Sequence, residues 1–303
     1  MANGLGSVAF VDPQRGFAVG LPDVILYTED GGESWLNGSN RAELPSFARG
    51  MFGLTAVRFS DATHGVILGR GVTDLRDSKF GFHTEGFVLR TEDGGQSWVP
   101  APIMSEIPLA RGGGSEGGSF TTVCFTPEGA ALIAGNPPLL SQDGGATWTN
   151  IEERLVPDGD GPRWSTAHDA PQGAACLPGG RLWLATPRTV FGSVDAGATW
   201  AVLSEPPGGS IFAHIAFREP QTGWLTKGRV LRSVDGGFAW SAVDNAISPL
   251  IGSGATFFIS DTELLSTSFT AVSVSRDAGA TWQVFNVPTP NKVFGLADVA
   301  VIE

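Results

Sequence analysis

An eight-residue segment that occurs six times is the most regular chemical feature of the sequence. Each copy contains an aspartate, a glycine two positions later and a tryptophan at its end. The aspartates are Asp30, Asp93, Asp143, Asp195, Asp235 and Asp277. A carboxylate in a turn can accept hydrogen bonds from backbone amides, glycine permits a positive φ, and tryptophan can pack beneath the turn. These residues therefore predict a structural turn and not a catalytic site.

A second group of candidate residues lies between the repeated segments. Trp164 is the one tryptophan outside the repeat pattern, and it directly follows Arg163. Tryptophan and arginine are enriched among the residues that dominate binding energy. The predicted binding residues are Arg163, Trp164, His168, Asp169, Arg76, Phe80, Phe82, His83 and Arg111. The alternatives are that Trp164 only holds its own loop in place and that the charged residues belong to solvated loops.

Metal, cofactor and nucleotide sites are not indicated. Three of the four histidines, His83, His168 and His214, lie in or near this group, but their spacing matches no metal motif. A protein metal site needs three or four converging ligands. The glycine-rich stretch 111–119 lacks the strand–loop–helix setting of a phosphate-binding loop. We therefore expect no metal and no cofactor.

The two cysteines are too few for a disulfide framework or a four-sulfur zinc site. Cys124 directly precedes Phe125 in the first strand of its repeat. In the next repeat, Cys176 stands at the position equivalent to Phe125. Because side chains alternate along a strand, the two thiols should point to opposite faces. This reasoning predicts buried free thiols and no disulfide.

Composition excludes several classes of protein. Of 303 residues, 42% are hydrophobic and 17% charged, so the chain should fold despite its 42 glycines and 20 prolines. The net charge of −12 would repel a phosphate backbone, which argues against nucleic-acid binding. No apolar run is long enough to span a membrane, and residues 1–20 do not resemble a signal peptide. If a leader was removed, we expect an extracytoplasmic location that is periplasmic, lumenal or secreted.

The repeat indicates the architecture that must position these residues. The terminal tryptophans recur with a period near 40 residues, lengthened by insertions in the first half of the chain, which is the length of a propeller blade. Three short apolar runs precede each turn, as in 8–10, 17–20 and 24–27, and a fourth follows it. We therefore predict one all-β domain over residues 1–303, a β-propeller of six four-stranded blades, with seven blades as the alternative.

The repeated segments resemble the BNR or Asp-box repeat, Ser/Thr-x-Asp-x-Gly-x-x-Trp, of sialidase-type and sortilin-type propellers. The extended pattern, with Phe-x-Asp and Gly-aromatic strands ahead of Thr-Glu-Asp-Gly-Gly-x-Ser-Trp, makes the chain most similar to the photosystem II stability and assembly factor propellers. The resemblance covers residues 7–287 and implies a non-catalytic scaffold that binds a protein partner. It is specific for fold and nearly silent on function, because one fold can carry unrelated activities.

The long insertions should all lie on one face of this propeller. They are 37–53, 101–119 and 150–172 between blades, and 72–85 within the second blade. The aspartate turns should occupy the opposite face. Binding residues are commonly grafted on loops held by a rigid scaffold, so the insertion face is the predicted binding face. Tolerated surface drift is the alternative explanation of the insertions.

Enzymatic activity is disfavoured, although not excluded. The resemblance to sialidases implies an arginine triad and a tyrosine nucleophile, but the only tyrosine, Tyr27, belongs to the third strand of its repeat, far from the central pocket. Other glycosidases need two carboxylates about 5–10 Å apart, and no motif here selects a pair. We therefore predict a protein-binding scaffold, with carbohydrate binding or glycoside hydrolysis as the alternative.

Overall fold

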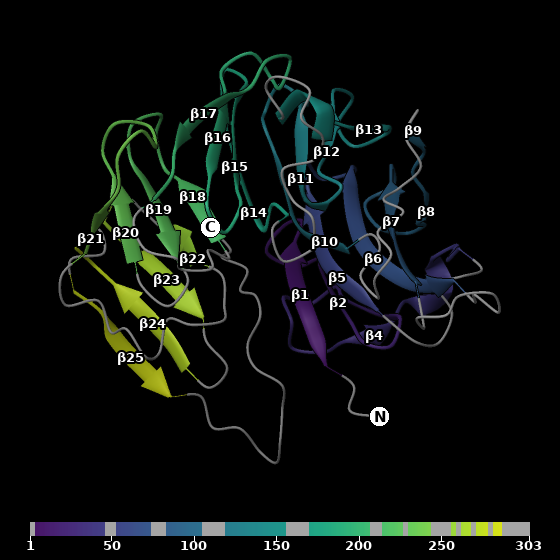
Figure 1. The fold of residues 1–303 in the computed structure, drawn as a ribbon. Helices are drawn as coiled ribbons and strands as arrows, with labels where there is room; N and C mark the ends of the chain where they lie inside the picture. Colours follow the sequence, from purple (N-terminus) through teal and green to yellow (C-terminus); the bar gives the residue numbers. More distant parts are fainter. Residues whose placement is uncertain are drawn as a thin grey trace. The chain divides into compact units, whose positions relative to one another are not determined.

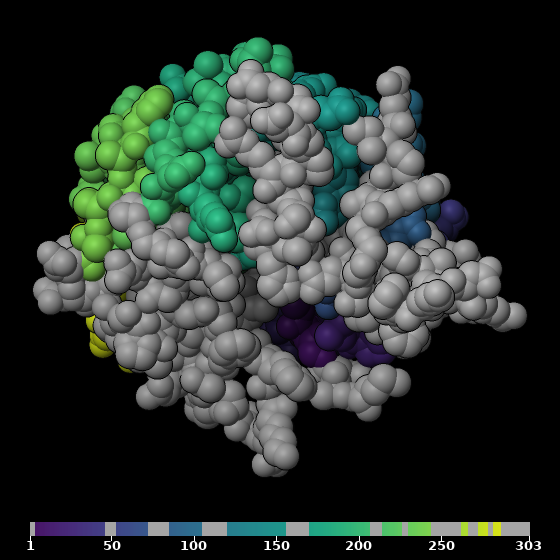
Figure 2. All heavy atoms as spheres, in the orientation of Figure 1, coloured from purple at the N-terminus to yellow at the C-terminus, as the bar shows by residue number. Residues whose placement is uncertain are grey.

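The computed structural model describes residues 4–45, 53–73, 83–104, 119–155, 170–206, 214–226, 230–243, 256–258, 262–267, 271–277 and 281–286, which Figures 1 and 2 colour along the chain. These residues form β-strands, joined by turns and two short 3-10 helices, η1 (Ser39–Arg41) and η3 (Glu152–Leu155). None of the helices within these ranges is long and apolar enough to cross a membrane.

The strands form six sheets, one for each repeat, and we call these sheets blades one to six (Figure 1). The chain divides into two compact units, the first with blades one to three and the second with blades four to six. Within each blade, successive strands pair as antiparallel neighbours in chain order. The all-β, six-bladed fold predicted from the sequence is therefore confirmed.

The first unit begins with blade one, which contains β1 (Leu5–Phe10), β2 (Gly16–Gly20), β3 (Val24–Thr28) and β4 (Leu36–Asn37). Blade two contains β5 (Leu54–Phe59), β6 (Gly65–Thr73), β7 (His83–Thr91) and β8 (Val99–Pro100). Blade three contains β10 (Ser119–Phe125), β11 (Ala131–Asn136), β12 (Leu139–Ser141) and β13 (Trp148–Asn150). A fifth strand, β9 (Ile103–Met104), pairs in parallel with β13, which the sequence did not predict.

The second unit has three four-stranded blades. Blade four contains β14 (Gly173–Leu177), β15 (Arg181–Ala185), β16 (Val190–Ser193) and β17 (Ala201–Ser204). Blade five contains β18 (His214–Phe217), β19 (Gly223–Thr226), β20 (Val230–Ser233) and β21 (Ser241–Ala242). Blade six contains β22 (Thr256–Phe258), β23 (Leu264–Thr267), β24 (Ala271–Ser275) and β25 (Gln283–Asn286).

Side chains between neighbouring blades form the core of each unit. In the first unit, Phe17 of β2 lies 5.4 Å from Phe59 of β5 and 5.9 Å from Trp98, measured between ring centroids. Ile67 and Leu89 are fully buried in the same cluster. Burial of one such aliphatic side chain stabilises the fold by about 1.5–3 kcal/mol. Trp98, which ends the repeated segment of blade two, is therefore part of the packing between blades.

Both cysteines are disulfide-bonded in the structure, so the prediction of free thiols is wrong. The error lies in the argument from opposite strand faces. Within each unit, one face of a blade packs against the opposite face of the next blade, as Phe17 and Phe59 illustrate. Side chains on opposite faces of equivalent strands are thus the ones that can meet, and alternation is no argument against a disulfide.

The insertion predicted at 72–85 is in part a strand pair. β6 and β7 each contain nine residues, whereas β2 and β3 of blade one contain five. Their pairing runs from Gly65↔Thr91 to Thr73↔His83, while β5 pairs with β6 only as far as Gly69. Blade two therefore extends as a two-stranded arm at the end opposite its aspartate turn.

Candidate functional site

The aspartate turn, defined here as the eight-residue segment that ends at the tryptophan, is the best-described polar site of the molecule. In blade three, Oδ1 of Asp143 accepts hydrogen bonds from the Ser141 hydroxyl at 2.7 Å and the Thr147 amide at 2.9 Å. Its Oδ2 accepts a bond from the Thr147 hydroxyl at 2.6 Å. The Ser141 oxygen in turn accepts the amide of Gly145 at 2.8 Å. Both carboxylate oxygens are thus used within the turn.

The same bonds recur around the other five aspartates. The first residue of the turn donates its hydroxyl to Oδ1 in every blade, and the residue four positions after the aspartate donates its amide to Oδ1. A side-chain hydroxyl reaches Oδ2 in five blades. Blade five differs, because Ala239 stands at that position and contributes only its amide.

These hydrogen bonds stabilise the charged form of the aspartates. Bonds from Ser34 and Thr28 lower the pKa of Asp30 to about 2, and bonds from Thr199 and Ser193 lower the pKa of Asp195 to about 2. Burial raises the pKa of Asp143, but the bonds from Thr147 and Ser141 outweigh it, so that the net shift is downward. Carboxylates held ionised in this way are poor proton donors at neutral pH. The role of these aspartates is therefore to stabilise the turns.

A backbone bond ties each aspartate turn to the first turn of its own blade. The amide after the aspartate donates to a carbonyl between the first two strands in blades one to five, with N···O distances of 2.8–2.9 Å. The donors are Gly31, Gly94, Gly144, Ala196 and Gly236, and the acceptors are Gln14, Thr63, Gly129, Gly180 and Gln221. In these blades the two turns therefore lie together at one end of the sheet.

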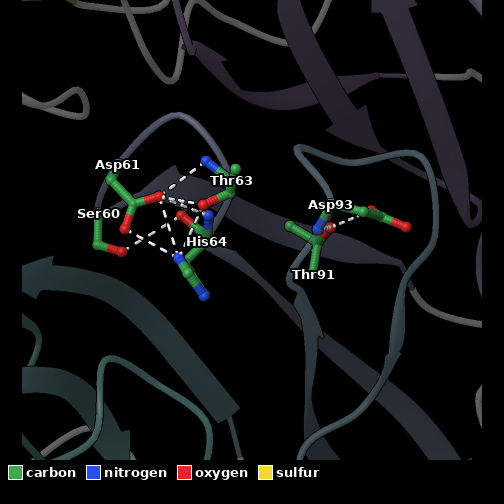
Figure 3. Close-up of polar contacts among 6 residues, drawn as sticks. All are labelled: Ser60, Asp61, Thr63, His64, Thr91 and Asp93. Carbon is green, nitrogen blue, oxygen red and sulfur yellow. Dashed lines mark hydrogen bonds and ion pairs between the residues drawn. The ribbon is translucent and has the colours of Figure 1, made fainter.

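One of these first turns contains a histidine–aspartate pair (Figure 3). Nδ1 of His64 lies 2.9 Å from Oδ2 of Asp61, and both residues are exposed. Asp61 also accepts the amides of Thr63 at 2.7 Å and His64 at 2.8 Å. Although burial raises the pKa of Asp61, these bonds lower it overall. Sequence reasoning missed this pair, although the Phe-x-Asp pattern marks its position.

The equivalent turn of blade one shows that the aspartate and its partner stabilise the turn. Asp12 occupies the same place, accepts the amides of Gln14 and Arg15, and forms an ion pair with Arg15 at 2.7 Å. Histidine in blade two and arginine in blade one thus contact the aspartate in the same way. The repetition argues that Asp61 and His64 close a turn and do not form a catalytic dyad.

The predicted binding residues fall almost entirely outside the described residues. Those outside are Arg163, Trp164, His168, Asp169, Arg76, Phe80, Phe82 and Arg111. His83 is the exception, because its backbone opens β7 opposite Thr73 on the arm of blade two. Within the ranges that the structure describes, no three His, Cys, Asp or Glu side chains form a group that could hold a metal ion.

Tyr27 has a packing role in the structure. It lies on β3, is half-buried, and its ring is covered by the Arg41 guanidinium at 3.6 Å from the centroid. A cation over an aromatic face is a favourable contact. The ring also packs against the core cluster of the first unit. The position agrees with the expectation that Tyr27 belongs to a third strand.

The repeated blades and turns define a β-propeller, and solved structures agree with that class. No family model matches the sequence, and no curated protein does. A structure of YCF48 bound to a D1 peptide aligns at 20% identity and a TM-score of 0.60, covering 93% of this chain and 82% of that chain. YCF48 from Cyanidioschyzon merolae aligns at 18% identity and a TM-score of 0.63, with coverage of 93% and 85%.

A glycoside hydrolase is also among the similar structures. The GH74 xyloglucanase from Xanthomonas campestris aligns at 16% identity and a TM-score of 0.54. It covers 94% of this chain, but the chain spans only 45% of the enzyme. At these identities the comparisons establish the propeller fold, and they leave the activity to be argued from the molecule itself.

Proposed function

We propose that this propeller is a non-catalytic scaffold that binds a segment of a partner protein through its insertion face. The observation that carries the proposal is the similarity over most of both chains to YCF48, a protein whose structure holds a bound peptide. The chain is thus proposed to resemble the photosystem II assembly and stability factors in function as well as in fold.

A difference between the two ends of a blade supports this proposal. At the aspartate-turn end, the carboxylates are occupied by their own turns, and a backbone bond fixes the paired turns of blades one to five. The long sequence insertions are proposed to project from the other end, where the arm of blade two also extends. A rigid end and a variable end are the arrangement expected of a scaffold that carries binding loops.

The GH74 neighbour favours carbohydrate binding or hydrolysis as the second candidate function. The chain matches less than half of that enzyme, so an active site that uses the remainder would be incomplete here. Two carboxylates that follow blade three, Glu152 and Glu153, lie within the described residues, on η3. They are adjacent in sequence, which does not place two carboxylates across a sugar as hydrolysis requires.

A binding assay distinguishes the two functions. We would titrate the protein with a labelled D1 peptide and, separately, with xyloglucan oligosaccharides. Peptide binding that falls about thirtyfold in Trp164→Ala and in Arg163→Glu supports the scaffold, because truncation of a hot-spot residue costs about 2 kcal/mol or more. Saturable oligosaccharide binding without peptide binding supports the second function.

The control must alter charge at the aspartate-turn end without breaking an ion pair. Arg276 is unsuitable, because its Nε lies 3.2 Å from Oε1 of Glu263 and a reversal would place two acids together. Gln96 is exposed in the turn of blade two and has no charged partner. Gln96→Glu should therefore bind like the wild type. Weaker binding by this control, with both loop variants unchanged, would show that the wrong face was chosen.

A further inference from the structure

The outer strand of a blade can accept an additional extended segment, and the first unit shows this twice. In blade two, the Trp98 amide donates to Arg41 and the Trp98 carbonyl accepts the amide of Glu43, both at 2.8 Å. Ala42 thereby forms a parallel bridge to Trp98. In blade three, the Trp148 amide donates to Pro102 at 3.0 Å, and β9 pairs in parallel with β13.

This added segment covers the tryptophan that ends the turn. Trp98 and Trp148, whose main chains are paired in this way, are both 0% exposed. The same position of blade one is occupied by Trp35, which is only half-buried, and the next residue, Leu36, is 50% exposed. Among the described residues, no segment covers in blade one the apolar surface that is covered in blades two and three.

The main chain at Trp35 faces the same way as at Trp98 and Trp148. The amide of Gly38 donates to Ile25 of β3, just as the amide of Ala101 donates to Val88 of β7 and that of Ile151 to Pro138, directly before β12. Since backbone groups alternate in direction along a strand, the amide and carbonyl of Trp35 point away from β3. Within the described part of the chain, no backbone group pairs with them.

The charge at this edge indicates what kind of segment it accepts. Residues 28–37 contain Glu29, Asp30 and Glu33 and no lysine or arginine. Both glutamates are exposed, whereas in blade two Glu92 is paired with Arg90 and Gln96 replaces the second glutamate. A positively charged segment would therefore be attracted to the edge of blade one.

We propose that the outer edge of blade one, formed by Trp35, Leu36 and Asn37, binds an extended, positively charged segment of a partner protein. The segment adds as a fifth strand parallel to β4, pairs with the outward amide and carbonyl of Trp35, and covers the indole with an aliphatic or small side chain. Strand addition at an open edge is an established mode of peptide recognition. Apart from Asn37, at which the insertion 37–53 begins, this edge lies outside the insertions of the proposed function.

The test uses full-length protein and a fluorescein-labelled peptide, Lys-Val-Ala-Ile-Lys, followed by anisotropy. An otherwise identical peptide with N-methyl groups on alternate amides cannot form the strand pairing. We expect saturable binding of the first peptide and at least about tenfold weaker binding of the second. The double variant Glu29→Lys with Glu33→Lys should weaken binding about tenfold, whereas Gln96→Lys, the matched position of a covered blade, should change it less than twofold.

Fluorine NMR of protein labelled with 5-fluorotryptophan locates the contact. The resonance of Trp35, identified by its loss in Trp35→Phe, should move on addition of the peptide. The proposal is overturned by no binding at about 1 mM peptide, by equal binding of the methylated peptide, or by an unmoved Trp35 resonance. It is equally overturned if removal of residues 287–303 moves that resonance without peptide, because the chain's own end would then be the occupant.

Discussion

The indole ring of Trp183 in blade four stacks on the phenyl ring of Phe217 in blade five, with centroids 3.9 Å apart and planes 10° from parallel. The indole Nε1 also donates a 3.0 Å hydrogen bond to the carbonyl of Gly236 in the aspartate turn of blade five. Trp183 is 4% exposed. One side chain therefore joins the second strand of a blade to both the first strand and the turn of its neighbour in the same unit.

Replacement of Trp183 should destabilise the second unit. Trp183→Leu removes the ring stacking and leaves the Gly236 carbonyl without its indole partner, so we expect the free energy of unfolding to fall by about 3–5 kcal/mol. Urea denaturation followed by circular dichroism measures this change. Trp183→Phe keeps an aromatic ring and should lose less. Equal losses in the two variants would contradict a contribution from ring stacking.

A side-chain hydroxyl at position 239 should stabilise the turn of blade five. Ala239 is the one residue at its position that leaves Oδ2 of the aspartate without the side-chain bond made in the other five turns. Ala239→Thr should therefore raise the free energy of unfolding by about 0.5–1.5 kcal/mol. Ala239→Val has nearly the same shape without the hydroxyl. If both variants raise the melting temperature equally, the hydrogen bond is not the cause.

The turn of blade four contains a strained alanine. Ala196 has a φ of 55°, whereas glycine occupies this position in blades one, two, three and five, with φ between 69° and 85°. A non-glycine residue in this left-handed region destabilises the fold by roughly 1–2 kcal/mol. Glycine removes this strain, but it loses more conformational entropy on folding, so only part of the strain energy is recovered. Ala196→Gly should thus stabilise the protein by about 0.5–1 kcal/mol in thermal denaturation.

The reverse substitution in blade three isolates the backbone effect. Gly144 has a φ of 71°, and a Cβ built on it meets no atom within 4 Å. Gly144→Ala should therefore destabilise the protein by about 1 kcal/mol through strain alone. A neutral result would show that the turns tolerate alanine, and the expected gain in blade four would lose its basis.

Acid should weaken the aspartate turns within a defined pH range. The folded-state pKa of Asp195 is about 2, below the 3.8 of an unperturbed aspartate. A depressed carboxyl pKa contributes stability that is present above the unfolded value and is lost as the pH falls through the folded value. The melting temperature should therefore fall between pH 4 and pH 2. In Asp195→Asn this fall should be smaller, and an unchanged slope would contradict the assignment.

The number of free thiols reports the disulfide state directly. Because neither cysteine is free, denatured and unreduced protein should react with no thiol reagent, and reduced protein should react at Cys124 and Cys176. Reduction should also lower the free energy of unfolding, since removal of a native disulfide typically costs about 2–5 kcal/mol. Two reactive thiols without reductant would contradict the bonded state.

The sequence was sufficient to predict the fold because the same turn-forming segment occurs in it six times. Each aspartate accepts bonds from residues of its own turn, and the indoles of Trp148, Trp200 and Trp240 donate to a glycine carbonyl of theirs, so spacing along the chain already determines these contacts. The strand boundaries were less predictable. β9 joins β13 across a long sequence separation, and the extension of β6 and β7 depends on mutual pairing that neither strand reveals alone.

The candidate sites were less accessible to sequence reasoning. The open edge at Trp35 could not be recognised from the repeat, because Trp35 and Trp98 occupy the same position of it and their burial depends on the segment that lies beside them. The cysteine prediction failed for a related reason, since alternation describes one strand and says nothing of the blade it faces. The residues around Trp164 lie outside the described ranges, so the binding role assigned to them stays a prediction.

The bond between the two turns of a blade also bears on how the chain reaches its native state. Gly144 and Gly129 come together through two successive hairpins of blade three, with no contribution from another blade. Contacts that close within a short stretch of chain form faster than those that join distant parts. Each blade can therefore acquire its hairpins as it leaves the ribosome, and the slow step of folding is expected to be the docking of finished blades.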